Sequence, residues 1–413
     1  MSKLQKLRVI TREIATPEGF DLTKHFPENA MVFIRGGAGI VGFGEVARFE
    51  TSGPDRISEL AGVWKEQVAL AEVTDPLRIQ CTGLVAFGSV TFAPNSTINS
   101  LLVVPRLVLG TRDGRSWITE LVPEGEEPLD ASFLTKDANY RVNEKLKFID
   151  GAMSAEHFVT QAKSAIDKIR AGKIQKVVLA RDIVAQLPDG FDLRSALRTL
   201  ALRYPSCWIY SVAGNFGASP ELLVRVSHGQ VSARVLAGTA ARGESPELDQ
   251  QIASSLLVSE KNLQEHRFAV ESMVQELAPF CTTVDTDEKP FSLALPNLWH
   301  LASDVYGKLK KNLSVLDLAA FLHPTAAVAG TTRRAAQELI SELEPFDRGG
   351  YAGPVGWIGA DGDGEWAIAI RGAFIEDTVV TAYAGCGLVS ESDPIDELAE
   401  TELKFAPIRN ALS

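Results

Sequence analysis

The residues that decide the fold lie between Leu322 and Lys404, in three segments that start at positions 322, 348 and 382: LHPTAAVAGTTRRAAQELI, RGGYAGPVGWIGADGDGEWAIAIRGAF and AYAGCGLVSESDPIDELAETELK. The first predicts a glycine-punctuated loop, and the second predicts two β-strands around a tight turn. The third predicts a capped helix that carries Glu397, Glu400 and Lys404. Together these features indicate a polar ligand site on a β-sheet.

Around this stretch, the composition is that of a globular chain. With 413 residues, of which 45% are hydrophobic, the chain can bury a large core. Its net charge of −12 weighs against nucleic acid or an anionic membrane as the main partner, because both reward a basic surface. Residues 1–19 lack the apolar core of a signal peptide, and no run reaches the roughly 18 apolar residues of a membrane span. We therefore expect a cytoplasmic protein, and a monomer, since the mixed polar surface gives no reason to expect an obligate dimer.

The four cysteines, Cys81, Cys207, Cys281 and Cys386, are far apart in the sequence. They form no C-x-x-C pair and have no histidine at metal-ligand spacing. Neither a zinc site nor a disulfide framework is indicated, and we expect reduced thiols in the core.

The amino-terminal part predicts antiparallel β-structure with one covering helix. Residues 31–48, MVFIRGGAGIVGFGEVAR, predict a glycine-relieved hairpin, because extended residues follow the glycines where a dinucleotide loop needs a helix. Residues 56–73 have apolar side chains at helical spacing. Strand-like runs follow at 83–92, 101–109 and 116–121, with Asp113-Gly114 as a hairpin turn before the last. The polar residues 123–147 predict a long surface loop, with a domain linker as the alternative.

The middle of the chain begins with a predicted helix at 154–171, which leads into a strand that starts at Lys176. Alternation in this strand puts Lys176 on the same face as Val178 and Ala180. A lysine at the start of a strand is most often a solvated end. Glu221 follows a Ser-Pro pair and precedes an apolar run, a pattern that is most often an exposed strand start.

One long helix is predicted after Pro246, with apolar residues on one stripe. Glu265 falls far from the centre of this stripe, and His266 falls near its edge. The simplest interpretation is a solvated helix face for Glu265 and a core-edge histidine for His266.

Two charged sets close the chain. In a predicted strand over 365–375, Arg371 shares a face with small alanines, which leaves room for a ligand, and its guanidinium can bind a carboxylate with two hydrogen bonds. The last helix is capped by Asp393 with Pro394 in its first turn. Periodicity alone places the polar side of this helix in solvent, with a wet cavity as the alternative.

Several separate motifs resemble those of the chorismate-utilising enzymes, which include isochorismate, salicylate, anthranilate and aminodeoxychorismate synthases. They occur in the family's order from about Lys176 to Lys404, over more than half of the chain. The matching segments are K-V-V-L-A-R from 176, S-P-E-L-L from 219, A-G-T-A-A-R-G from 237, S-E-K-N-L-Q-E-H from 259, H-P-T-A-A-V-A-G from 323, Y-A-G-P-V-G from 351 and E-L-A-E-T-E-L-K from 397.

The resemblance assigns roles to individual residues. It implies that Lys176 is the general base and Glu221 the general acid. It also implies that Glu265 and Glu400 bind Mg²⁺, with Glu397 as a supporting or water-mediated ligand; carboxylate and water oxygens suit this ion. The residues that it places at the substrate, chorismate, are Arg371 and Tyr351 at the enolpyruvyl carboxylate, and Gly238, Thr239, His323, Ala327, Gly385, Gly387 and Lys404.

The resemblance further implies an α+β fold, in which large antiparallel β-sheets pack in a sandwich with helices outside. One chorismate-binding domain is expected over 1–413, with a less family-specific β-rich part at 1–150 and the catalytic motifs at 151–413. Ala327 favours the isochorismate branch of the family, so the expected reaction moves the hydroxyl of chorismate from C4 to C2 and feeds menaquinone or siderophore biosynthesis.

Three alternatives remain at this stage. One is a salicylate synthase, which would go on to eliminate pyruvate, and another is an anthranilate- or aminodeoxychorismate-type component. The third belongs to a different class, a non-catalytic regulator that binds chorismate. Such a regulator would lack Lys176 or Glu221, and both are present.

Overall fold

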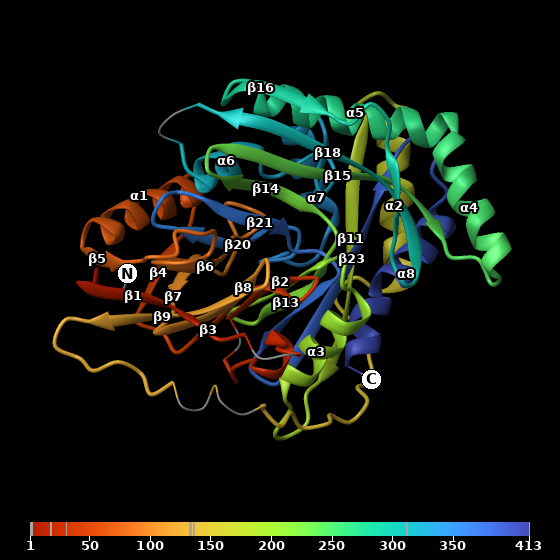
Figure 1. The fold of residues 1–413 in the computed structure, drawn as a ribbon. Helices are drawn as coiled ribbons and strands as arrows, with labels where there is room; N and C mark the ends of the chain where they lie inside the picture. Colours follow the sequence, from red (N-terminus) through yellow and green to blue (C-terminus); the bar gives the residue numbers. More distant parts are fainter. Residues whose placement is uncertain are drawn as a thin grey trace.

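The computed structural model describes residues 3–16, 19–29, 31–131, 134, 137–310 and 313–412, apart from the side chains of Lys261 and Glu265. In this part of the chain the strands form two large sheets, one of 13 strands and one of 10, with helices around them (Figure 1). Every pairing between these strands is antiparallel except that of β1 with β5. The predicted α+β fold, with large antiparallel sheets and helices outside, is confirmed.

The first sheet carries the strand that begins at Lys176. Its strands, in spatial order, are β10 (Ile149–Asp150), β11 (Lys176–Gln186), β23 (Val379–Leu388), β22 (Gly372–Glu376), β13 (Asn215–Ser219), β12 (Trp208–Val212), β2 (Met31–Arg35), β3 (Ala38–Phe43), β8 (Leu107–Arg112), β9 (Arg115–Pro123), β1 (Leu7–Ile14) and β5 (Ala71–Thr74), with β19 (Gly330–Thr331) also paired to β11.

The second sheet is built from the remaining strands. In spatial order these are β16 (Cys281–Thr286), β18 (Leu298–Leu309), β15 (Gln230–Ala241), β14 (Leu222–Ser227), β21 (Gly364–Ile368), β20 (Pro354–Gly359), β6 (Val85–Ser89), β7 (Ser100–Val104) and β4 (Ala47–Thr51), with β17 (Phe291–Ala294) also paired to β18.

Strands from the end of the chain occupy the middle of both sheets. In the first sheet, β23 and β22 lie between β11 and β13. In the second, β21 and β20 lie between β14 and β6. Each sheet is therefore continuous only when residues 354–388 are in place.

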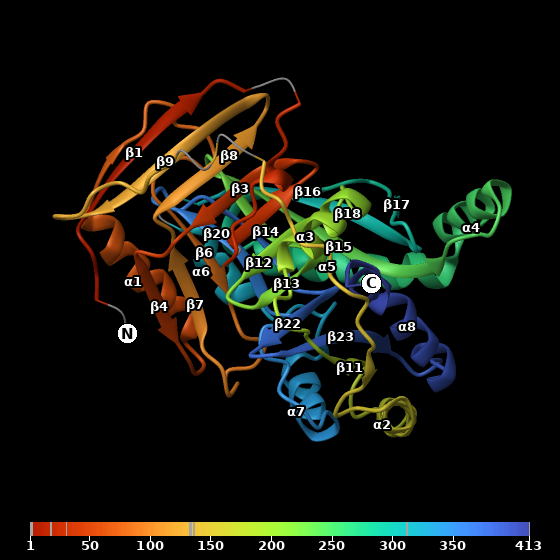
Figure 2. The same cartoon turned by 90° about the horizontal axis from the view of Figure 1, so that it is seen from below.

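The helices cover the outer faces and edges of the sheets. They are α1 (Arg56–Ala69), α2 (Ala155–Arg170), α3 (Leu193–Arg203), α4 (Pro246–Val258), α5 (Glu260–Leu277), α6 (Val315–Leu322), α7 (Arg333–Leu343) and α8 (Pro394–Ala411), with a short 3₁₀ helix at Leu22–Lys24. α5 packs along β15 and β18, and α2, α7 and α8 gather around β11 and β23, at the end of the molecule away from α1 (Figure 2). Within the described residues, no helix combines the length and apolar character needed to cross a lipid bilayer.

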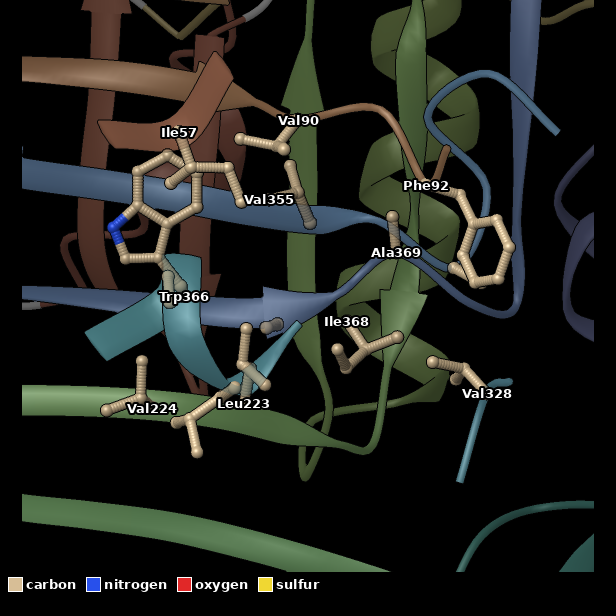
Figure 3. Packing of buried hydrophobic residues seen from close by; sticks show 14 of the residues in the cluster. Ile57, Val90, Phe92, Leu223, Val224, Val328, Val355, Trp366, Ile368 and Ala369 are labelled. Atoms are coloured by element: carbon tan, nitrogen blue, oxygen red, sulfur yellow. The ribbon is translucent and has the colours of Figure 1, made fainter. Parts of the chain in front are cut away.

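Apolar side chains of both sheets share one large core, which continues beneath α1 and α6. Trp366 and Val355 of the second sheet pack there near Ile57 of α1, while Phe92 lies near Ala369 and Val328 near Ile368 (Figure 3). A second core covers the other face of the first sheet under α3 and α8. The four cysteines are buried and free.

In the amino-terminal part, the predicted hairpins are confirmed and two boundaries are corrected. β2 and β3 form the glycine hairpin, and Asp113-Gly114, both with positive φ, joins β8 to β9. The helix predicted over 56–73 ends at Ala69, because Ala71–Thr74 pairs with β1 as β5. The strand predicted over 101–109 is two strands, β7 and β8, separated at Pro105-Arg106.

The helices of the middle region agree with the sequence except in one place. α2 is capped by Ser154, whose side chain accepts a hydrogen bond from His157 N. The single long helix predicted after Pro246 is two helices, α4 and α5. Ser259, with φ −68° and ψ 110°, ends the first and caps the second by accepting from Asn262 N.

The prediction of one strand over 365–375 is wrong, because the chain passes from one sheet to the other within this segment. β21 belongs to the second sheet and β22 to the first, and the connection between them runs through Ala369–Arg371. Arg371 has φ +53°, a left-handed conformation that ends a strand.

A second connection makes the same change of sheet beside it. β13 in the first sheet leads through Pro220-Glu221 to β14 in the second. Each connection is hydrogen-bonded to a strand that flanks the other: Ile368 N of β21 donates to Glu221 O at 3.1 Å, and Ala218 N of β13 donates to Arg371 O at 3.2 Å. We call these two connections the sheet crossings.

Candidate active site

A cavity of about 270 Å³ lies where the sheet crossings meet β11, β23, β15, α5 and α8. It brings together most of the residues that the sequence singled out. Those that line it are Lys176, Glu221, Gly238, Thr239, Ala327, Tyr351, Arg371, Gly385, Gly387, Glu397, Glu400 and Lys404.

Lys176 enters the cavity from the first residue of β11, on the face that it shares with Val178. On the neighbouring strand β23, Val178 pairs with Gly387. A Cβ atom added at Gly387 would lie 2.8 Å from Lys176 Cε and 3.4 Å from its Nζ. The lysine side chain therefore lies directly over Gly387, and the absence of a side chain at this glycine gives it room.

Glu221 comes from the first sheet crossing and is 7% exposed. Burial raises its pKa to about 7, against the opposing effect of the positive charges of Lys176, Arg371 and Lys404. A carboxyl group with such a pKa holds a proton at and below neutral pH, so it can donate one.

Arg371 comes from the second sheet crossing and is likewise buried. Its Nη2 donates to His300 Nε2 at 3.0 Å. Burial lowers the pKa of His300 well below its ordinary value, and the charge of Arg371 lowers it further. The imidazole is thus neutral, with Nε2 as acceptor, and its Nδ1 lies 3.1 Å from Thr239 Oγ1 and 3.4 Å from Gly238 O.

Gly238 and Thr239 sit at an irregularity in β15. The register with β18 shifts between Ala237 and Thr239, and Gly238 has φ +82°. A Cβ atom at Gly238 would lie 3.5 Å from Asn262 Cβ of α5. The bulge turns the backbone of this strand into the cavity, opposite α5.

Tyr351 and Gly385 form another wall. The ring of Tyr351 stacks on that of Tyr383, with centroids 5.1 Å apart. A Cβ atom at Gly385 would lie 3.0 Å from the Tyr351 hydroxyl. Ala327 adds a small apolar side chain to the lining. This wall therefore offers a flat aromatic surface beside one hydroxyl group.

The polar side of α8 faces the cavity, so the wet-cavity alternative holds and the solvent interpretation is wrong. Lys404 Nζ lies 2.6 Å from Glu400 Oε1 and donates to Gly385 O at 2.7 Å. Burial alone would raise the pKa of Glu400, but the charge and hydrogen bond of Lys404, with the charges of Arg371 and Lys176, lower it overall. Glu397 accepts from Ser392 Oγ at 2.8 Å, and burial raises its pKa.

Three residues discussed in the sequence analysis are not among the described side chains that line the cavity: Glu265, His323 and His266. The side chain of Glu265 is not among those that the structure describes. His323 is buried away from the cavity lining, where its Nε2 meets Phe92 O at 3.1 Å and burial lowers its pKa to about 3. His266 is buried with Nε2 2.9 Å from Ser303 Oγ, as expected of a core-edge histidine.

A divalent cation would find carboxylate donors on α8. Among the described side chains, no three His, Cys, Asp or Glu residues form a metal-binding group. Glu397 and Glu400 nevertheless supply two carboxylates on one side of the cavity, beside Ser392. Oxygen donors of this type fit Mg²⁺, which keeps part of its water shell.

The cavity also contains polar residues that the sequence did not single out. They are His300, Asn262, Tyr383 and Ser392. His300 gave no signal because a histidine inside an apolar strand has no distinguishing pattern. Asn262 lies within a recognised motif, but its position opposite Gly238 depends on the break between α4 and α5.

Comparison with known proteins identifies a family and its structures. Residues 5–413 match the family model described as chorismate binding enzyme. The isochorismate synthase MenF of Bacillus subtilis is 30% identical over 401 residues, which cover 90% of this chain and 85% of that protein.

Two solved structures have the same fold. A putative 2,3-dihydroxybenzoate-specific isochorismate synthase, DhbC, from Bacillus anthracis superimposes with a TM-score of 0.77 at 31% identity, over 95% of this chain and 98% of that one. The menaquinone-specific isochorismate synthase MenF from Escherichia coli has a TM-score of 0.80 at 24% identity, over 100% of this chain and 96% of that one.

Proposed function

The chain belongs to the chorismate-binding enzymes, and from this premise we propose that it is an isochorismate synthase that depends on Mg²⁺. The reaction moves the hydroxyl group of chorismate from ring carbon C4 to C2. The observation that carries this proposal is the meeting of Lys176 with Glu221, a carboxyl group whose pKa is raised to about 7, in one cavity that also holds Arg371.

In the proposed mechanism, a water molecule attacks C2 while Lys176 takes its proton. A lysine amine accepts a proton only in its neutral form. The C4–O bond breaks as the C2–O bond forms, and Glu221 donates its proton to the departing hydroxyl, which leaves as water. One water enters and one leaves, so isochorismate is an isomer of chorismate.

Residues on the other walls of the cavity would bind the substrate. Arg371 can hold the enolpyruvyl carboxylate with two hydrogen bonds, assisted by the Tyr351 hydroxyl. The neutral His300 accepts from Arg371 and fixes the plane of its guanidinium. Glu400 and Glu397, with Glu265, would hold Mg²⁺, which when bound would neutralise the C1 carboxylate and draw charge from the ring.

The small side chain of Ala327 supports isochorismate, and not salicylate, as the product. It adds neither a hydroxyl group nor bulk to the cavity lining. Such a wall neither presses the enolpyruvyl ether toward elimination nor supplies a polar group that would help its C–O bond break. We therefore expect isochorismate to be released and to equilibrate with chorismate from either direction.

The test is product analysis of the purified protein with chorismate and Mg²⁺ at neutral pH. Isochorismate should form, chelation should abolish turnover, and added Mg²⁺ should restore it. Stoichiometric salicylate and pyruvate without a second enzyme would instead establish the salicylate synthase alternative. Full activity in excess chelator would remove the metal from the mechanism.

The proposal extends to the setting of the enzyme. The two similar structures are described as 2,3-dihydroxybenzoate-specific and menaquinone-specific. We propose that isochorismate made here feeds either siderophore or menaquinone biosynthesis, and that the enzyme acts as a cytoplasmic monomer. Size-exclusion chromatography with light scattering tests the oligomeric state.

A further inference from the structure

A buried ion pair lies behind the cavity, between the end of α7 and the turn that leads to Tyr351. Glu344 is 8% exposed and Arg348 is 3% exposed. Arg348 Nε donates to Glu344 Oε2 at 2.8 Å, and Arg348 Nη2 donates to Glu344 Oε1 at 2.6 Å. The pair is bidentate, and neither residue lines the cavity.

The pair holds the edge of β11, the strand that starts at Lys176. Ala180 N donates to Glu344 Oε1 at 2.8 Å, and Arg348 Nη2 donates to Val178 O at 2.8 Å. The opposite edge of β11 is paired with β23. On the edge that meets the ion pair, β19 pairs with residues 176–177 and β10 with residues 183–184. Between them, the two side chains take the place of a neighbouring strand.

The same arginine reaches two more walls of the cavity. Its Nη1 donates to Val328 O at 2.9 Å, next to Ala327, and its own carbonyl accepts from Tyr351 N at 2.8 Å. The guanidinium stacks 4.4 Å from the centre of the Phe92 ring. The guanidinium of Arg348 therefore joins the strand of Lys176 to the loop of Ala327, and it also lies 5.7 Å from the centre of the Tyr351 ring.

We propose that Glu344 and Arg348 are positioning residues, which set the place of Lys176 relative to the substrate without touching either the substrate or the cavity. This inference rests on the proposed function. Burying two charges is unfavourable unless their hydrogen bonds are satisfied, and here the fork of Arg348 reaches a carboxylate and two carbonyls at once. A lysine has one donor atom and cannot span these acceptors. Misplacement of a catalytic group by about 1 Å can cost on the order of 10²-fold in rate.

The experiment compares Arg348→Lys in two backgrounds, wild type and Lys176→Ala. In the otherwise wild-type enzyme, Arg348→Lys should lower kcat roughly 10-fold or more and raise KM a few-fold. In the Lys176→Ala background the loss in kcat should shrink to within about 2-fold, because the group that Arg348 positions is gone. The effect on KM, which acts through the Tyr351 turn, should persist in both backgrounds.

A matched control is Arg194→Lys. Arg194 also forms a bidentate pair, with Asp192 at 2.8 Å for both contacts, at the start of α3 and away from the cavity. This variant should keep the wild-type kcat. Glu344→Gln is the second test variant, since its amide still has an oxygen to accept from Ala180 N but cannot form the fork; it should lower kcat in the same direction.

Three results would overturn the inference: an unchanged kcat in Arg348→Lys, an equal loss of kcat in both backgrounds, or a failure of both Arg348→Lys and Glu344→Gln to fold, which would make the pair a folding element only. If wild type leaves chorismate unchanged, the proposed function fails instead. Hydrogen exchange over residues 176–182 then decides the positioning role alone. Faster exchange in Arg348→Lys, but not in Arg194→Lys, supports it, and equal exchange refutes it.

Discussion

Lys176 and Glu221 line the same cavity, but they lie on different kinds of structural element. Lys176 starts a regular strand, and Glu400 and Lys404 lie on a regular helix. Glu221 and Arg371 lie in the sheet crossings, where the chain leaves one sheet for the other. The crossings place their charges deep between two sheets, so burial dominates the pKa of both residues. Burial is also the largest single effect on Glu400 of α8, but the charge and hydrogen bond of Lys404, together with the charges of Arg371 and Lys176, lower its pKa overall. The two carboxyl groups of α8 that line the cavity thus differ: Glu400 is paired with Lys404, whereas burial raises the pKa of Glu397, as it does for Glu221 in the crossing.

The largest effect should come from removing one catalytic group of each kind. Lys176→Ala, on the strand, and Glu221→Gln, in the crossing, should each lower kcat by roughly 10²-fold or more with the fold retained, since this is the usual contribution of a general acid or base. Steady-state kinetics and circular dichroism check this. A variant that keeps a near-normal kcat and loses only affinity would move its residue from catalysis to substrate binding.

Arg371→Lys tests what the second crossing contributes. The lysine keeps a positive charge but loses the planar fork and the contact with His300. We expect a loss of about 1.5–3 kcal/mol of binding energy, or roughly 10- to 150-fold in kcat/KM, mostly through KM. Equal kcat/KM in the two enzymes would show that this crossing holds a structural cation only.

The pH dependence sharpens the contrast further. If Glu221 must be protonated, kcat/KM should fall about tenfold per pH unit above pH 7, and Glu221→Gln should lack this limb. The folded-state pKa of Glu221 lies above the ordinary 4.5, so the folded state holds the extra proton between these values, and the contribution of Glu221 to wild-type stability decreases as pH rises from 4.5 to about 7. Relative to wild type, Glu221→Gln should gain up to about 3 kcal/mol over that window. Urea unfolding at pH 4.5 and pH 8 measures this, and a constant difference between the two proteins would contradict the raised pKa.

The smallest effect should come from filling the space that Gly387 of β23 leaves for the side chain of Lys176. In Gly387→Ala the new Cβ would lie 2.8 Å from Lys176 Cε, so the lysine must shift. We expect a loss of a few-fold to tenfold in kcat with little change in stability, because a flexible side chain can yield. Gly62→Ala in α1 is the control: nothing lies within 4 Å of its Cβ, and it should leave kcat unchanged and add up to about 1 kcal/mol of stability. Equal kcat in Gly387→Ala and wild type would show that Lys176 needs no room there.

The sequence predicted most regular elements for identifiable reasons. Asp113-Gly114 marks a hairpin, and Ser154 and Asp393 cap helices, because these residue types satisfy local backbone requirements. The resemblance to a family then identified most of the residues that line the cavity. Ser259 was missed because a serine between two amphipathic stretches reads as part of one helix, although here it caps a second.

The sheet crossing at Arg371 could not be predicted from periodicity. The alternation of A-I-A-I-R is that of a strand, and nothing local shows that its two ends pair with different sheets. His300 was missed for a related reason, since its role depends on Arg371, which is distant in sequence and reaches it only through that crossing. Contacts set by long-range pairing carry little signal in one sequence.

The late strands in the middle of both sheets have a consequence for synthesis on the ribosome. Until residues 372–388 emerge, β11 and β13 have no partner on the edges that β23 and β22 will occupy. In the second sheet, β14 and β6 likewise lack a partner on one edge until residues 354–368 emerge. At about 5–20 residues per second, the nascent chain carries these open, apolar edges for many seconds. Such edges recruit other chains. Residues 354–388 close both sheets, so chaperone demand should be highest until residue 388 has emerged, and a chain truncated before that residue should aggregate.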